Sequence, residues 1–233
     1  MEPLEWDYIR KFSAEESSGY FIAADEVGRG SLFGPVSVGA ISVPFSYFNE
    51  GPEYKTPPFH EWHSEIRDSK KLSAKKRNYL SEKIISNFSI RVSHVSVGYI
   101  DKYNINRAIQ YALYRAVQSL KLKHPSGDDP AFILLDGNYR FQYPMLGMSS
   151  AMPPIHTIIG GDDRLFSIGC ASIVAKVERD AMIAKASEKF PEYNLASNAG
   201  YGTLKHREAL ASSGMSIHHR KSFLKKMVIG NKS

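Results

Sequence analysis

Two adjacent carboxylates, Asp25 and Glu26, stand directly before a glycine-rich turn that contains Arg29. An apolar run over 20–24 precedes the pair and another over 36–43 follows the turn, so the sequence predicts a strand on each side. Because side chains alternate across a strand, the two carboxylates point the same way only where the strand ends. Carboxylates at a strand end suit a hard metal ion, and Arg29 adds a planar cation that binds phosphate. The alternative interpretation is a hairpin whose acidic turn has no chemical role.

Further carboxylates follow later apolar segments. Asp136 comes directly after the apolar run 131–135, and Asp162 stands between a predicted short strand and a predicted long helix. Taken singly, Asp136 could be a turn residue, and Asp162 or Asp163 could serve only to favour a helix N-terminus. Taken together, carboxylates from separate segments are what a two-metal phosphodiester site requires, in which two divalent ions ~4 Å apart activate a water and stabilise the leaving oxygen. Mg²⁺ prefers such oxygen ligands and keeps some of its waters.

Basic and aromatic residues accompany these acids. Lys70 and Lys71 precede a predicted helix, and Lys176 falls on the predicted long helix. The three lysines fit phosphate contacts and solvated surface positions equally well. Tyr201 lies between two glycines, which favours an exposed ring that can stack on a sugar or base, with a core position as the alternative. A lone histidine such as His206 is more often structural than catalytic, so we expect a structural role.

The apolar periodicity predicts the elements that must position these residues. Residues 1–18 are expected to form a helix or arm, and 44–67 a long loop. Strands are expected over 20–25, 36–43, 88–99, 131–135 and 155–159, and helices over 73–86 with Ser73 as N-cap, 104–122, 165–189 and from near 203. Early strands followed by interleaved helices indicate a layered α/β domain with a helical C-terminal part.

The composition is that of a globular protein of 233 residues, with 42% hydrophobic and 23% charged residues. A net charge of +6 is compatible with a polyanionic partner. Cys170 is the single cysteine and is expected in the core, so a disulfide within the chain is excluded, which fits a reducing cytosol. The sequence shows no secretory signal, and no apolar run approaches the roughly 20 residues of a membrane-spanning helix. We therefore expect a cytoplasmic location and no membrane partner.

These features together resemble ribonuclease HII, the bacterial type 2 ribonuclease H. The motifs that carry the resemblance occur in family order between about residues 19 and 224, at 25–36, 68–72, 136–138, 161–162, 171–180, 200–206 and 219–223. No single motif is decisive, whereas seven in the family's order are highly specific. Two positions depart from the family pattern, because Gly160 and Ala199 stand where the family usually has lysines. Two phosphate-directed charges are therefore missing.

The resemblance implies a ribonuclease H-like α/β fold, with a mixed five-stranded sheet flanked by helices and a C-terminal helical extension. It implies a catalytic domain over 1–190 and a helical segment over 191–233 that contributes to substrate binding. It also implies that four carboxylates hold Mg²⁺ or Mn²⁺ at a two-metal site, namely Asp25, Glu26, Asp136 and Asp162. The substrate-binding residues that it implies are Gly28, Arg29, Gly30, Lys70, Lys71, Ser172, Lys176 and Tyr201.

The activity implied by the resemblance is that of a monomeric endonuclease of ribonucleotide excision repair. It would hydrolyse the RNA strand of RNA–DNA hybrids and nick duplex DNA on the 5′ side of embedded ribonucleotides, leaving a 3′-hydroxyl and a 5′-phosphate. The glycine-rich turn and Tyr201 would read the ribonucleotide, whose 2′-hydroxyl distinguishes RNA from DNA. One alternative is a type 3 ribonuclease H, which acts on hybrids and lacks the Gly-Arg-Gly turn. Another is a catalytically silent nucleic-acid-binding module, which the presence of all four acids disfavours.

Overall fold

The computed structural model describes Glu5, Lys11 and residues 19–48, 61–124, 127–141 and 151–224. Apart from Glu5 and Lys11, the helix or arm expected over 1–18 lies outside the described residues, as does the middle of the loop expected over 44–67. The described ends of that loop form two short 3-10 helices, η1 (Phe45–Phe48) and η2 (Glu61–Glu65). The expected loop therefore contains local helical structure on both sides.

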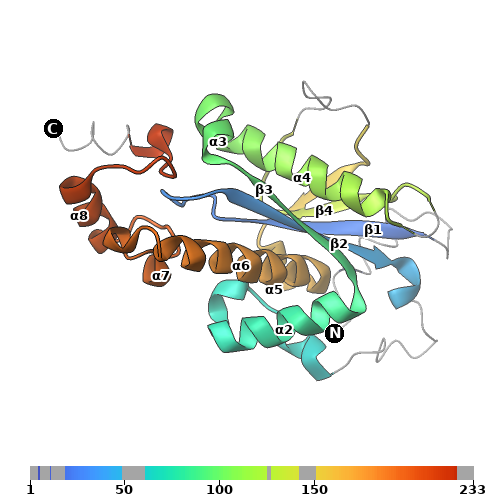
Figure 1. Cartoon of the computed structure of the whole chain (residues 1–233). Coiled ribbons are helices and arrows are strands. Elements are labelled where there is room, and N and C mark those ends of the chain that lie inside the picture. The colour runs from blue at the N-terminus through green and yellow to red at the C-terminus, as the bar shows by residue number, and fades with distance from the viewer. Residues whose placement is uncertain are drawn as a thin grey trace.

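A five-stranded sheet with the order β3-β2-β1-β4-β5 forms the centre of the molecule (Figure 1). Strand β1 pairs antiparallel with β2 and parallel with β4, and β4 pairs parallel with β5, so the predicted mixed sheet is confirmed. The strands are β1 (Tyr20–Val27), β2 (Val36–Pro44), β3 (Ser89–Val95), β4 (Ile133–Asp136) and β5 (Ile155–Ile158).

Helices cover both faces of this sheet (Figure 1). One face carries α3 (Val97–Tyr103) and α4 (Ile105–Lys121), and the other carries α2 (Ala74–Asn87) and α6 (Phe166–Ser187). Shorter helices are η3 (Ser69–Lys71), α5 (Gly161–Arg164), η4 (Pro191–Tyr193), α7 (Leu195–Asn198) and α8 (Leu204–Ser213). None of the helices in the described part of the chain combines the length and apolarity that a bilayer crossing needs.

The apolar residues of β1 alternate between two cores. Phe21 and Ala23 belong to the core beneath α2 and α6, whereas Ile22 and Ala24 belong to the core beneath α4. Helix α6 approaches the sheet closely at Gly39, where an added Cβ would lie 2.5 Å from the Ala171 carbonyl oxygen. The expected core position of Cys170 is confirmed, because this residue is fully buried in the same layer.

Side-chain caps explain where several helices begin. Ser73 caps α2 as predicted, accepting a hydrogen bond from the Lys76 amide. The predicted strand over 88–99 was wrong at its C-terminal end, because β3 ends at Val95 and Ser96 caps α3 instead. The alternation of apolar residues continues past Val95, but the hydroxyl of Ser96 accepts from the Tyr99 amide and starts a helix there.

Two buried histidines join the segment after α8 to the backbone of Tyr201. The Nδ1 of His206 donates to the Tyr201 carbonyl at 2.9 Å, because a carbonyl can only accept. The Nε2 of His206 then accepts from the Nε2 of His219 at 3.1 Å, and the Nδ1 of His219 accepts from the Ser216 amide. This pattern uses each ring once as donor and once as acceptor, so both rings are neutral. Their burial agrees with the structural role expected for His206.

We predict that acid weakens the fold through this pair. Burial lowers the pKa of His219 to about 4 and lowers that of His206 from 6.5. The unfolded chain therefore binds more protons than the folded chain between pH 6.5 and 4, so the free energy of unfolding falls as pH falls through that window. His219 contributes a loss of about 2 kcal/mol between pH 7 and pH 5. Urea unfolding at the two pH values measures this loss.

The control for this prediction is the exposed neighbour His218. A His219→Asn variant should lose part of the difference between pH 7 and pH 5, whereas His218→Asn should keep it. An equal difference in wild type and His219→Asn would show that the pair does not carry the acid sensitivity.

Candidate active site

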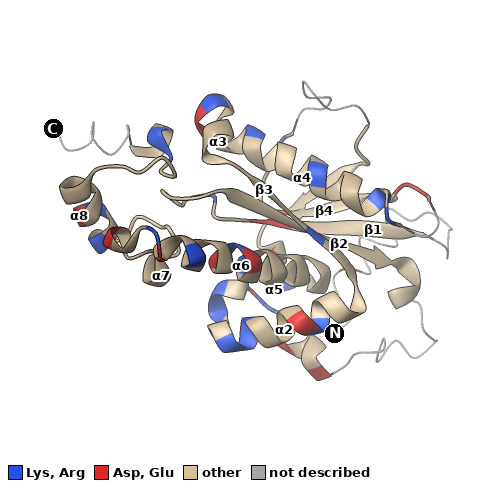
Figure 2. Cartoon of the chain, viewed as in Figure 1, with Lys and Arg blue, Asp and Glu red and all other residues tan. Residues whose placement is uncertain are grey.

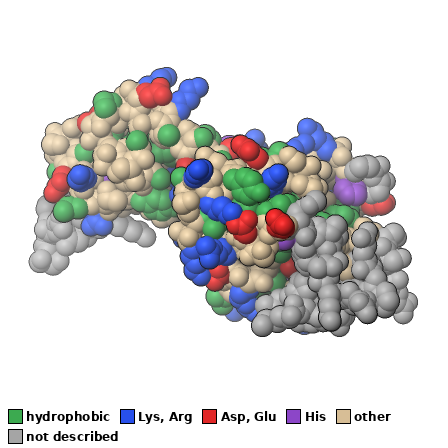
Figure 3. Space-filling model, turned by 90° about the horizontal axis from the view of Figure 1, so that it is seen from below, with side chains coloured by type: hydrophobic (Ala, Val, Ile, Leu, Met, Phe, Trp, Pro, Cys, Tyr) green, Lys and Arg blue, Asp and Glu red, His purple; other side chains and the backbone are tan. Residues whose placement is uncertain are grey.

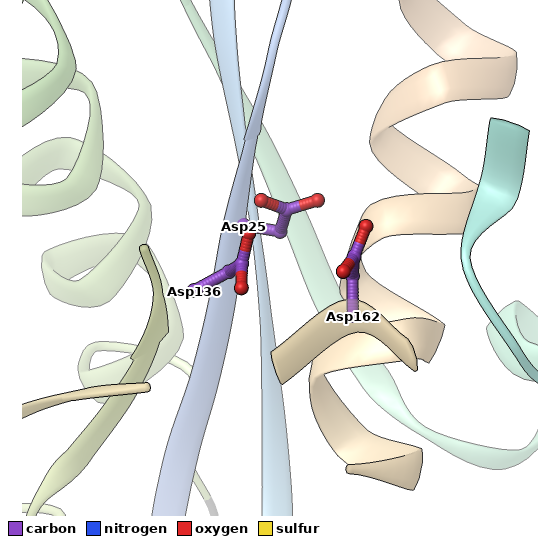
Figure 4. Close-up of side chains that lie close together, drawn as sticks. All are labelled: Asp25, Asp136 and Asp162. Atoms are coloured by element: carbon purple, nitrogen blue, oxygen red, sulfur yellow. The ribbon is translucent and has the colours of Figure 1, made fainter. Parts of the chain in front are cut away.

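Three carboxylates converge at one edge of the sheet. Asp25 lies near the end of β1, Asp136 is the last residue of β4, and Asp162 lies in α5, between β5 and α6. One carboxylate oxygen of each residue lies within 4.8 Å of those of the other two (Figure 4). The convergence follows from topology, because the carboxyl ends of the parallel strands β1 and β4 meet at the same edge.

The strand alternation sends Asp25 and Glu26 to opposite sides of β1. Asp25 continues the row of Phe21 and Ala23 on the α6 side, and Asp136 follows Leu134 onto the same side. Glu26 continues the other row and takes a hydrogen bond from the Tyr139 hydroxyl. The sequence predicts that the two carboxylates point the same way only if the strand ends there. Strand β1 continues through Glu26 to Val27, so the two side chains diverge.

Two glycines bring Asp162 into the cluster. Gly160 adopts a left-handed conformation with φ of 67°, and the amide of Gly161 donates to the Asp136 carboxylate at 2.6 Å. The next residue, Asp163, is exposed and pairs with Lys71 at 2.6 Å, so it faces away from the other acids. Of the two adjacent acids, the structure thus places Asp162 in the cluster.

The cluster concentrates negative charge where water is scarce. Burial raises the pKa of Asp25 well above its ordinary value, and the nearby charges of Glu26, Asp136 and Asp162 raise it further. Burial and the charge of Asp136 likewise raise the pKa of Asp162. The Lys70 ammonium, 3.5 Å from the Asp162 carboxylate, partly offsets this increase. The repulsion between these like charges decreases when a cation binds among them.

The donor set fits a divalent metal ion. The clustered side chains offer oxygen ligands only, which suits Mg²⁺ and Mn²⁺. One oxygen of Glu26 is buried and has no hydrogen-bond partner among the described residues, although the other accepts from Tyr139. Asp25, Asp136 and Asp162 would hold the ion, and Glu26 lies close enough for the charge of Asp136 to raise its pKa.

A cavity of about 380 Å³ is lined by Asp25, Glu26 and Asp136 together with most of the predicted substrate-binding residues, whereas Asp162 is not among its lining residues. Lys71 does not line this cavity, since it pairs with Asp163 outside it. Lys and Arg residues lie along the helices around the sheet (Figure 2), and several of their side chains gather near the middle of the face in Figure 3. The lining includes Asp25, Glu26, Gly28, Arg29, Gly30, Lys70, Asp136, Ser172, Lys176 and Tyr201.

The glycine-rich turn is held against the segment that contains Tyr201. The Gly200 carbonyl accepts from the amides of Leu32 and Phe33, and Ser31 forms an isolated β-bridge with Tyr201. The Tyr201 ring lies 5.7 Å from the Lys176 ammonium. Segments distant in sequence therefore place the turn and the tyrosine ring at one cavity.

Two buried arginines hold this turn through hydrogen bonds to backbone carbonyls. Arg179 donates to the carbonyls of Phe33, Pro35 and Ala199 at 3.0–3.3 Å. Gly28 has a φ of +83°, and a Cβ added there would collide with the Arg179 guanidinium. Arg220 donates to the carbonyls of Gly34 and Arg29 at 3.0 and 2.9 Å, so it packs on the body of the protein.

Sequence reasoning missed some residues of the site. Ser69 lines the cavity, and its hydroxyl lies 3.0 Å from that of Ser172. Its position inside the 68–72 motif was the available signal. Tyr139 and Asn106, which contact Arg29, carry no signal in the sequence, because the chain brings them to the turn from 77 or more residues away.

Comparisons with known proteins agree with this geometry. A family model described as Ribonuclease HII matches residues 22–226. A curated relative from Trichormus variabilis, named Ribonuclease HII, is 41% identical over 209 residues, which cover 88% of this chain and 82% of the relative.

Solved structures share the fold. Ribonuclease H2 from Pyrococcus horikoshii OT3 superposes with a TM-score of 0.65 at 20% identity, covering 89% of this chain and 96% of that one. Bst-RNase HIII in complex with Mn²⁺ gives a TM-score of 0.62 at 16% identity, covering 92% of this chain and 71% of that one. At these identities the structures support the fold alone, and the predicted ribonuclease H-like fold is confirmed.

We predict that Asp25→Asn stabilises the metal-free protein and removes its response to Mn²⁺. The folded state raises the pKa of Asp25, so the ionised carboxylate costs stability at neutral pH, above its ordinary pKa of 3.8. Replacing it with a neutral amide should therefore raise the free energy of unfolding in EDTA at neutral pH. Thermal unfolding in EDTA and in millimolar Mn²⁺ measures both effects.

Asp163→Asn is the matched control, because Asp163 is adjacent to the cluster but exposed. This variant should keep the rise in melting temperature that Mn²⁺ produces. If Mn²⁺ stabilised Asp25→Asn as much as the wild type, Asp25 would not belong to the metal site.

Proposed function

The chain belongs to the ribonuclease HII family and is a ribonuclease H, and on this premise we propose that it nicks duplex DNA on the 5′ side of embedded ribonucleotides and hydrolyses the RNA strand of RNA–DNA hybrids. The products would carry a 3′-hydroxyl and a 5′-phosphate. The observation that carries the proposal is a single cavity that combines Asp25 and Asp136, two of the three clustered carboxylates, with Glu26, a glycine-rich turn and Tyr201.

The acids are proposed to hold Mg²⁺ or Mn²⁺ at a two-metal site. When bound, the ions supply an activated water and stabilise the leaving oxygen. The Mn²⁺ in the Bst-RNase HIII structure supports this choice of metal. Ser172 hydrogen-bonds to Asp25 and thereby orients its carboxylate. Lys70 faces Asp162 from 3.5 Å and offers a cation to the phosphate beside the scissile bond.

The glycine-rich turn and Tyr201 are proposed to recognise the ribonucleotide. A Cβ at Gly30 would meet no atom of the described residues within 4 Å, so the backbone there is open to the cavity. Such a backbone can approach a 2′-hydroxyl, which is the group that separates RNA from DNA at one position. The Tyr201 ring offers a face for the adjoining sugar, and Lys176 beside it offers a sequence-independent phosphate contact.

The remaining expectations form part of the same proposal. We retain a catalytic domain over 1–190 and a C-terminal helical segment over 191–233, which supplies Tyr201 to substrate binding. The chain is also proposed to act as a monomer. Ribonucleotide excision repair in the cytoplasm is the proposed setting. The family match favours this activity over that of a type 3 ribonuclease H.

We predict that Asp136→Asn abolishes nicking and leaves the protein folded. Asp136 contributes an oxygen to the cluster and accepts from the Gly161 amide, a bond that the asparagine oxygen can keep. Cleavage of a DNA duplex with one embedded ribonucleotide should fall by roughly a hundredfold or more. The assay is run with and without Mg²⁺, and circular dichroism checks the fold.

Asp163→Asn again serves as control and should cleave like the wild type. Retention of more than a few per cent of activity in a folded Asp136→Asn protein would remove Asp136 from the catalytic site. Absence of Mg²⁺-dependent nicking in the wild type itself would overturn the proposed function.

We also predict that Gly30→Ala impairs cleavage at a single ribonucleotide without affecting stability. The added methyl group has no atom of the described residues within 4 Å beyond the adjoining backbone, and the φ of Gly30 lies outside the left-handed region, so the fold tolerates it. The methyl would instead occupy the space proposed for the ribose. We expect kcat/KM for a duplex with one ribonucleotide to fall by about tenfold or more.

Gly98→Ala provides the matched control, because Gly98 also has open space around it and lies in α3, away from the cavity. It should leave both activity and melting temperature near their wild-type values. Unchanged kcat/KM in Gly30→Ala would show that the substrate does not approach this part of the turn.

A further inference from the structure

The guanidinium of Arg29 is solvent-exposed, yet two other parts of the chain hold it. Its Nη1 donates to the Tyr139 hydroxyl at 2.5 Å, and its Nη2 donates to the Asn106 side-chain oxygen at 2.9 Å. Tyr139 follows β4, and Asn106 lies in the first turn of α4. An exposed arginine is ordinarily free to sample many rotamers, so this double restraint requires an explanation.

The ring of Tyr139 is itself fixed in place. It lies 5.2 Å from the guanidinium carbon of Arg29 and stacks on Phe141 with a centroid distance of 4.9 Å. Gly137 allows the ring to fold back toward the strand end, because a Cβ there would lie 2.9 Å from the ring. The φ of Gly137 is +101°, which glycine adopts readily.

The Tyr139 hydroxyl also reaches the acidic end of the cavity. It accepts a hydrogen bond from Arg29, so its own proton is available to donate, and it donates to the Glu26 carboxylate. A single hydroxyl thus joins the cation of the glycine-rich turn to the acid beside the metal cluster. Each bond fixes the hydroxyl for the other, which restrains Arg29 more firmly than one contact would.

We propose that Tyr139 is a positioning residue that fixes the Arg29 guanidinium so that its remaining N–H groups face a backbone phosphate of the bound duplex. The inference rests on the proposed function. A guanidinium binds phosphate through a planar fork of donors, so its orientation decides whether two bonds or one can form. The terminal nitrogens each use one donor on the protein, and the remaining donors of this exposed residue have no hydrogen-bond partner among the described residues.

The restraint prepares the side chain before the substrate arrives. Ordering a long, flexible side chain on binding costs affinity, and an arginine that is already ordered avoids that cost. Loss of the Tyr139 hydroxyl should therefore weaken duplex binding by roughly three- to tenfold. The effect must act through Arg29, which separates positioning from a general contribution to the fold.

A double-mutant cycle tests this inference in the full chain. Binding of a fluorescent DNA duplex with one embedded ribonucleotide is measured by anisotropy in EDTA, so that neither metal nor cleavage enters the readout. Tyr139→Phe should weaken binding three- to tenfold, and Arg29→Ala should weaken it further and reduce the dependence of log affinity on log salt by about 0.9. Tyr139→Phe in the Arg29→Ala background should have no additional effect.

Tyr79→Phe is the matched control, because this tyrosine lies on α2 away from the cavity and its substitution should not change the affinity. Equal effects of Tyr139→Phe in both backgrounds would overturn the inference, since the residue would then act independently of Arg29. No effect in the wild-type background would also overturn it.

A second variant covers the case in which Tyr139→Phe folds poorly. Asn106 is exposed, and Asn106→Ala removes its hydrogen bond with Nη2 of Arg29. A double-mutant cycle of Asn106→Ala with Arg29→Ala should again be non-additive. The failure of the proposed function is recognised separately, in the Mg²⁺-dependent nicking assay of the wild type. If the wild type nicks normally but the effects of the Tyr139 and Arg29 substitutions on binding are additive, only the role of Tyr139 is contradicted.

Discussion

The parallel pairing of β1 with β4 is the constraint on which the site depends. Its register places Ala24 beside Leu135, so the following residues, Asp25 and Asp136, come together on the α6 side of the sheet. A slip of one residue would send either carboxylate to the opposite side, because side chains alternate along a strand. The apolar residues that alternate between the two cores hold the register, since a slip would also exchange every one of them.

This arrangement gathers like charges that only the surrounding fold keeps together. Burial and mutual repulsion raise the pKa values of Asp25 and Asp162, which means that the metal-free site is unfavourable at neutral pH. The packed layers of α6 and the sheet offset this cost. Perturbed carboxylates in a cavity are typical of functional sites, and here they lie beside a turn whose backbone is open to a ligand.

Two buried arginines, for which no ion pair is formed within the described part of the chain, support the turn that lines the cavity. Arg179 and Arg220 donate to backbone carbonyls of the glycine-rich turn and of the segments that pack on it. Burial and the nearby charge of Arg179 lower the pKa of Arg220 to about 9. The motif at 219–223 thus contains a buried arginine, Arg220, that supports the turn.

The sequence by itself determined the identity of the acids, the order of the strands along the chain and most helix boundaries. The apolar run before Asp136 identifies the end of a strand, the run before Asp25 identifies a strand that continues to Val27, and Ser73 marks a helix start, because these signals are local. It could not decide that Glu26 diverges from the cluster or that Lys71 lies outside the cavity, and it assigned Asp162 rather than Asp163 only through the family resemblance. Those outcomes depend on strand register, on the backbone conformation of a glycine turn and on ion pairs between distant segments, none of which is encoded in neighbouring residues. The contacts of Arg29 with Tyr139 and Asn106 exist for the same reason, since only the folded sheet and helices bring the three segments together.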